Sequence, residues 1–158
     1  MYFSMDEIGF ENTEKIKQMQ NESMKWRFIY DVAKEYGFDG IHFTPSLYKE
    51  FGLDLHNIPE YFVDFKLTLH LGGLYKIISD EYYKAFDNNL CDAFEIAIKH
   101  KMHDISVHPP DIYEISSNER EICLSYFDEI ISKWAKKAKE LNISFTLETH
   151  VYGKSFSV

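Results

Sequence analysis

The chain has 158 residues, of which 45% are hydrophobic and 16% aromatic, and its net charge at pH 7 is −9. This length and composition exclude a disordered chain and are sufficient for one domain with a hydrophobic core. The negative charge weighs against a nucleic acid as the main partner, because a phosphate backbone needs a basic surface.

The cysteines and the N-terminus predict a cytosolic protein. Cys91 and Cys123 each lie among helical apolar residues, so we expect both to be buried thiols in a reducing compartment. The N-terminus has no basic region followed by an apolar signal segment. The most apolar stretch, residues 62–78, contains three polar side chains that make it unsuited to a membrane: Asp64, Lys66 and His70.

The first part of the chain alternates strands with helices. A short strand is expected at 2–5, followed by a polar and partly helical segment at 6–20. Apolar residues at helical spacing predict a helix over 22–36. Gly37 follows it at the position where a residue in the left-handed conformation commonly ends a helix. A second strand is expected at 40–43.

The alternation continues to the end of the chain. We expect an irregular segment at 48–59, a short helix at 59–65 and a third strand at 66–70. Ser79 begins a predicted helix that runs to 101 and buries Phe86, Leu90, Phe94, Ala97 and Ile98. A strand at 104–108, a helix at 116–141 and a strand at 144–148 follow, with Ser116 and Glu119 forming a capping box for the helix.

Three of these strands end in a possible metal ligand. His70, His108 and Glu148 close successive apolar runs and are 38 and 40 residues apart, about the length of one strand, loop and crossover helix. Parallel strands would bring two imidazoles and a carboxylate to the same edge of the sheet, where α/β proteins place their active sites.

Five parallel strands and four helices fit two α/β architectures. Length favours a doubly wound open sheet, which about 150 residues can complete. Residue placement favours the first five strands of a (β/α)8 barrel, because the ligands are neighbours only if the strands are laid down in sequential order. A doubly wound sheet would also more often carry a glycine-rich phosphate turn after the first strand, and this sequence has none.

The three residues form a set of two histidines and one carboxylate that suits Zn, Mn, Fe or Co. The alternative is structural: each histidine would bond a backbone group at a strand end, and Glu148 would pair with a lysine. His42 ends the second strand at the equivalent place, and His150 returns to the face of Glu148. We therefore assign substrate binding to His42 and His150.

The chain resembles the xylose isomerase-like TIM barrels, a superfamily that includes sugar phosphate isomerases/epimerases and endonuclease IV. The matching segments lie before the second strand and at the ends of strands three to five: Tyr36–Ile41, Leu69–His70, Val107–Pro109 and Leu147–His150. The resemblance implies an incomplete parallel (β/α) TIM barrel with about five of eight units, and a single partial barrel domain spanning residues 1–158.

The resemblance also implies roles for the site residues. In the family, the glutamate that closes strand five binds metal and, in the epimerases, takes part in proton transfer, which Glu148 would inherit. His70 and His108 match histidines that bind metal in the endonuclease IV branch. The implied cofactor is a divalent metal: Zn, Mn, Co or Mg. His42 departs from the family, where this position is often acidic, and the ligands of strands six to eight have no counterpart.

The expected function is a metal-dependent isomerase or epimerase acting on a small sugar or sugar phosphate, by proton transfer next to a metal-polarised carbonyl. One alternative is an endonuclease IV-like phosphodiesterase acting on abasic DNA, and another is a non-catalytic barrel fragment or binding module. We expect no membrane or nucleic-acid partner. The missing strands would come from a longer chain or from association, including a homo-oligomer, and activity of this chain alone is doubtful.

Overall fold

The computed structural model describes residues 2–4, 10–72, 75–110, 112 and 115–148. Its strands are β1 (Tyr2–Ser4), β2 (Gly40–Phe43), β3 (Lys66–Leu71), β4 (Asp104–Val107) and β5 (Ser144–Leu147). Its α-helices are α1 (Phe10–Gln18), α2 (Glu22–Glu35), α3 (Pro45–Glu50), α4 (Asp80–Lys99) and α5 (Ser117–Leu141). Two 3₁₀ turns, η2 (Leu55–Asn57) and η3 (Glu60–Asp64), lie between α3 and β3.

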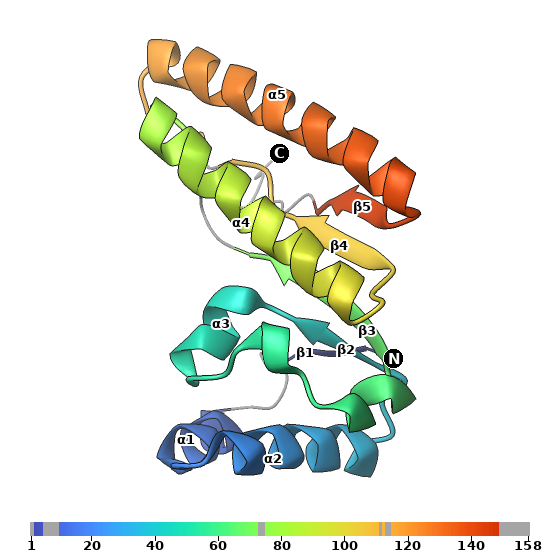
Figure 1. Ribbon diagram of the computed structural model, residues 1–158. Coiled ribbons are helices and arrows are strands. Elements are labelled where there is room, and N and C mark those ends of the chain that lie inside the picture. The colour runs from blue at the N-terminus through green and yellow to red at the C-terminus, as the bar shows by residue number, and fades with distance from the viewer. Residues whose placement is uncertain (1, 5–9, 73–74, 111, 113–114, 149–158) are drawn as a thin grey trace, which may run out of the picture.

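The strands form one parallel sheet in the order β1-β2-β3-β4-β5, so each strand pairs with the next one along the chain. A doubly wound sheet would reverse direction at a switch point. The sequential order therefore confirms the (β/α) barrel arrangement expected from the strand-end residues, and it places the ends of β3, β4 and β5 side by side (Figure 1).

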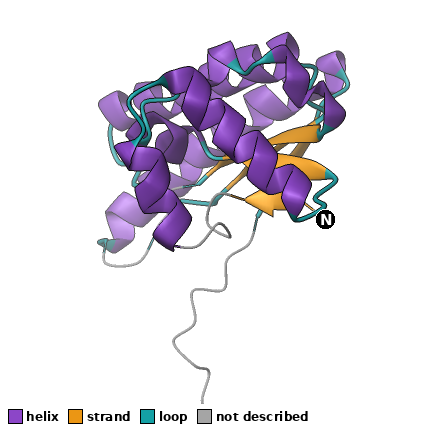
Figure 2. Cartoon of the chain, turned by 90° about the horizontal axis from the view of Figure 1, so that it is seen from below, coloured by secondary structure: helices purple, strands orange, loops and turns teal. Residues whose placement is uncertain are grey.

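The helices gather on one side of the sheet, as Figure 2 shows. Alternate residues of the strands, such as Ile41, Leu69 and Ile105, are fully buried within the hydrophobic core. The other alternate positions carry His42, Thr68, His70 and Ser106, which occupy the opposite face because side chains alternate along a strand. This second face is the inner side of the barrel segment.

Local capping signals fix the helix ends. The side chain of Ser79 accepts a hydrogen bond from the backbone of Tyr82 at the start of α4, and Ser116 and Glu119 form the predicted capping box of α5. Asn142 ends α5 in the left-handed region with φ 54°. Gly37 has φ 70° immediately after α2, where the sequence predicted a left-handed cap.

Three sequence expectations are wrong. Cys91 is exposed on α4, whereas Cys123 is buried as expected. Ile98 is 52% exposed, and Ile96 takes its place in the core because α4 is turned slightly from the predicted face. The segment expected to be irregular overlaps α3 and contains η2, since Pro45 occupies the first turn of α3 and Tyr48 is buried beneath it.

Among the described residues, no helix is both long and apolar enough to cross a membrane.

Candidate metal centre

The ends of β3, β4 and β5 bring His70, His108 and Glu148 together. His70 lies within β3, and His108 and Glu148 are the first residues after β4 and β5. The ladder continues through these positions, because the His108 N–H donates to Leu71 O at 3.3 Å and the Glu148 N–H donates to Val107 O at 3.0 Å. The backbone of both terminal residues is therefore held in register with the neighbouring strand.

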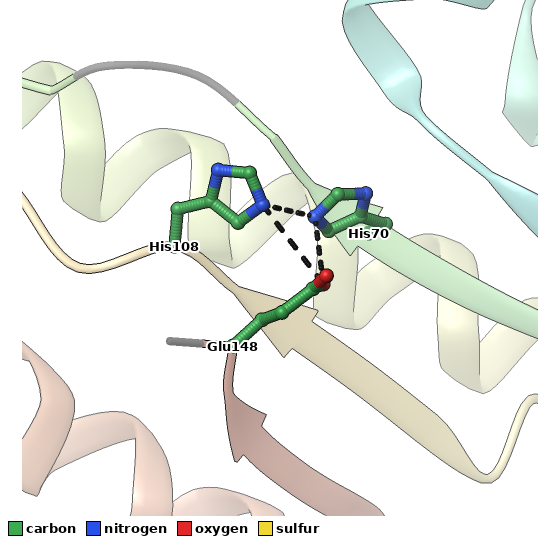
Figure 3. Close-up of side chains that lie close together, drawn as sticks. All are labelled: His70, His108 and Glu148. Carbon is green, nitrogen blue, oxygen red and sulfur yellow. Dashed lines mark hydrogen bonds and ion pairs between the residues drawn. The ribbon is translucent and has the colours of Figure 1, made fainter. Parts of the chain in front are cut away.

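The three side chains point toward one another (Figure 3). The Nε2 atoms of His70 and His108 are 2.7 Å apart. Oε2 of Glu148 lies 3.2 Å from Nε2 of His70 and 3.9 Å from Nε2 of His108. Three ligand atoms of the types that bind transition metals thus form one compact cluster, as the strand-end pattern predicted.

The spacing of these atoms fits a metal ion with little rearrangement. Nitrogen or oxygen ligands bind Zn²⁺ at about 2.0–2.1 Å, so two ligands of a tetrahedral site lie about 3.3 Å apart. The three distances of 2.7, 3.2 and 3.9 Å lie on either side of that value. Shifts of a few tenths of an ångström in the side chains would make them equal.

Burial differs sharply between the imidazoles and the carboxylate. The side chains of His108 and His70 are 10% and 15% exposed, whereas that of Glu148 is 43% exposed. The two rings are therefore held by their surroundings, while the carboxylate borders solvent. This arrangement suits two fixed ligands and one group that can also reach a bound molecule.

His42 lies beside the cluster but is not part of it. Its ring stacks on that of His70, with centroids 5.0 Å apart and planes 27° apart. Its Nδ1 atom is 2.6 Å from Oγ1 of Thr68, the residue that pairs with His42 across β2 and β3. The ring of His42 therefore borders that of His70 on the inner face of the sheet. His150, the other predicted substrate-binding residue, lies outside the described residues.

Two inner-face residues were missed by the sequence analysis. Thr68 and Ser106 are 8% and 7% exposed, and they precede His70 and His108 by two positions. The strand period of two places them on the same face as the histidines, one layer deeper in the barrel segment. The sequence could have identified Thr68 and Ser106 through that alternation, because a residue two positions before a strand-end histidine lies on the same side of the sheet.

The backbone after β3 passes close to the cluster. A methyl group added at Gly72 would lie 3.4 Å from Cε1 of His70, so a larger side chain would press on the ring. The hydroxyl of Tyr75 donates to Gly72 O at 3.2 Å, and burial raises the pKa of this phenol. This bond joins the side chain of Tyr75 to the backbone of Gly72 next to His70.

Comparisons with known proteins support the fold. No family model and no curated protein matches the sequence. A solved structure of a candidate sugar phosphate isomerase/epimerase from Anabaena variabilis matches with a TM-score of 0.63 and 13% sequence identity. The match covers 96% of this chain and 54% of the other, so the chain spans about half of that structure. This chain is therefore similar in fold to part of that structure.

Proposed function

We propose that this chain carries the metal-binding half of a sugar or sugar-phosphate isomerase or epimerase. The observation that carries the proposal is the convergence of His70, His108 and Glu148 at three consecutive strand ends. The name of the structural neighbour points to the same reaction class, although that protein is only 13% identical. The substrate would be a small carbohydrate, in keeping with the net charge of −9.

Each side chain has a distinct part in this proposal. His70 and His108 would hold a divalent metal with Oε2 of Glu148, and such an ion polarises a carbonyl or hydroxyl group of the substrate. The exposed carboxylate of Glu148 would take a proton from the carbon next to that group and return it to the adjacent carbon on the same face, whereas epimerisation would need a second acid on the opposite face. His42 would orient the sugar hydroxyls from the side of His70, and His150 is proposed to do so after β5.

Metal content is the first test. Elemental analysis of the purified chain is expected to show a metal content that falls by about one ion in both Glu148→Gln and His108→Ala. His103→Ala is the control, because His103 is exposed and its side chain lies outside the cluster. Equal metal content in all four proteins would contradict the metal centre and favour a non-catalytic module.

Proton exchange tests the chemistry separately. The protein is incubated with sugars and sugar phosphates in D₂O, and the reaction is followed by NMR. Deuterium is expected to appear on the carbon next to the carbonyl. Glu148→Gln should abolish this exchange while its circular dichroism spectrum stays unchanged. Cleavage of an abasic DNA duplex with no exchange on any sugar would instead support phosphodiester chemistry at the same residues.

A further inference from the structure

A second group of metal-ligand side chains lies on the helical side of the molecule. His56 belongs to η2, and Asp92 and Glu95 lie one turn apart on α4. Nε2 of His56 is 2.8 Å from Oδ1 of Asp92, and one ligand atom from each of the three residues falls within 4.8 Å of the others. We propose that His56, Asp92 and Glu95 bind a divalent transition-metal ion that fastens η2 to α4.

The backbone that carries the ring of His56 is held in place before any ion binds. The N–H of His56 donates to Oδ1 of Asp54 at 2.9 Å, and its carbonyl oxygen is 3.2 Å from Nε2 of His100. Leu55, the preceding residue, is 4% exposed and anchors the turn in the core. Binding therefore costs little ordering of the backbone that carries the imidazole.

The backbone that carries the two carboxylates is fixed, because both residues lie within a 20-residue α-helix. Among the described residues, no lysine or arginine nitrogen lies within 4 Å of either carboxylate. Asp92 pairs with the imidazole of His56, and Oε1 of Glu95 accepts a weak bond from Sγ of Cys91 at 3.7 Å. With a neutral imidazole the group carries two negative charges at short range, and a divalent cation would balance them.

The donor set selects the class of ion. One imidazole nitrogen and two carboxylate oxygens suit Zn²⁺, Co²⁺ or Ni²⁺, whereas Mg²⁺ and Ca²⁺ prefer oxygen ligands alone. His56 and Asp92 also line a cavity of about 490 Å³ between α3 and α4, together with Lys49, Asp54 and Asn89. The cavity gives the ion an entry path and room for water as a fourth ligand.

Metal titration with matched variants tests this site. Co²⁺ binding is measured calorimetrically for the wild type, His56→Gln and Asp92→Asn, with His103→Gln and Asp128→Asn as controls that remove the same groups elsewhere on the surface. Both site variants are expected to lose one binding event, or to weaken it more than about tenfold. Affinities and stoichiometries that match the wild type in both site variants would overturn the proposal.

Paramagnetic NMR shows where the ion binds. Substoichiometric Co²⁺ should broaden the amide signals of residues 55–57 and 91–96 in the wild type, and the broadening should disappear in Asp92→Asn. Broadening confined to the surroundings of His70 and His108 would also overturn the proposal. His108→Ala should leave the broadening at residues 55–57 intact, because the His56 site shares no residue with the strand-end cluster.

Discussion

Oγ1 of Thr68 lies 2.6 Å from Nδ1 of His42, so a hydrogen bond joins the inner faces of β2 and β3 next to the metal-ligand cluster. The two residues are register partners in the parallel ladder. Depending on the tautomer of His42, the hydroxyl donates to Nδ1 or accepts from it. In either case the bond fixes the plane of a ring that stacks on His70.

Replacement of Thr68 by valine tests this bond. Thr68→Val keeps the shape of the buried side chain but removes the hydroxyl, so we expect a loss of about 1–3 kcal/mol in the free energy of unfolding. The ¹⁵N shifts of the His42 ring should change at the same time. Thr68→Ser, which retains a hydroxyl, should restore the ring shifts. Unchanged ring shifts in Thr68→Val would show that the bond does not orient His42.

Trp26 anchors the aromatic cluster beneath β2. It is 2% exposed, stacks on Tyr48 at 5.7 Å, and meets Phe43 and Phe62 edge-on at 6.3 and 5.5 Å. Trp26→Ala is expected to lower the free energy of unfolding by about 3–5 kcal/mol. The substitution removes apolar surface that folding buries, and it leaves a cavity in the core. Urea unfolding measures the loss.

A control on the same helix separates packing from helix propensity. Met24 is 59% exposed, so Met24→Ala should change the free energy of unfolding by no more than about 0.5 kcal/mol. If Trp26→Ala lowers the free energy of unfolding no more than Met24→Ala does, the packing of the aromatic cluster does not stabilise the fold.

The capping box of α5 links stability to acid pH. Oε2 of Glu119 accepts from Oγ and N–H of Ser116, at 2.6 and 2.9 Å, and the hydroxyl bond is the main reason that the pKa of Glu119 is lowered. A carboxyl with a lowered pKa stabilises the fold above its unfolded pKa, and this contribution is lost as pH falls through the folded value.

Ser116→Ala should therefore have two effects. It should cost about 1 kcal/mol near neutral pH, because the N-cap bond to the Glu119 amide is lost. It should also make the free energy of unfolding fall less steeply with pH below about 4.5, the ordinary value for a glutamate. Urea unfolding across this range measures both, and Ser116→Thr should recover the wild-type slope. A slope that stays steep in Ser116→Ala would contradict the assignment.

The sequence was most informative where local chemistry decides the outcome. Capping residues such as Ser79, Ser116 and Asn142 mark helix ends because they bond the exposed backbone groups of the first and last turns. The convergence of His70, His108 and Glu148 was predicted because alternation and spacing place them at one edge of a parallel sheet, and the sequential strand order confirms that placement.

Predictions failed where tertiary packing decides. Cys91 and Ile98 both fit an apolar helical stripe, yet the face that α4 presents to the sheet leaves them exposed. The short helix α3 has too few residues for periodicity to identify it, and it is stabilised by the burial of Tyr48. The bond between Thr68 and His42 depends on which residues of two strands are opposite each other, and a single strand's pattern does not contain that register.

His100 provides the second link between pH and stability. Burial at the end of α4 is the main cause that lowers the pKa of His100 from 6.5, and the nearby charge of Lys99 lowers it further. The hydrogen bond to the carbonyl of His56 opposes both effects. Between the folded and unfolded pKa values the unfolded chain binds more protons, so the free energy of unfolding decreases as pH falls below about 6.5.

His100→Gln is expected to flatten this dependence, because glutamine does not titrate and its amide can still donate to the carbonyl of His56. Lys99→Gln should flatten it partially, since it removes only the smaller repulsive contribution while burial remains. The measurement is the free energy of unfolding in urea at about pH 7.5 and about pH 5.5 for the three proteins. If His100→Gln loses as much stability between these two conditions as the wild type, the buried imidazole is not what makes the fold sensitive to mild acid.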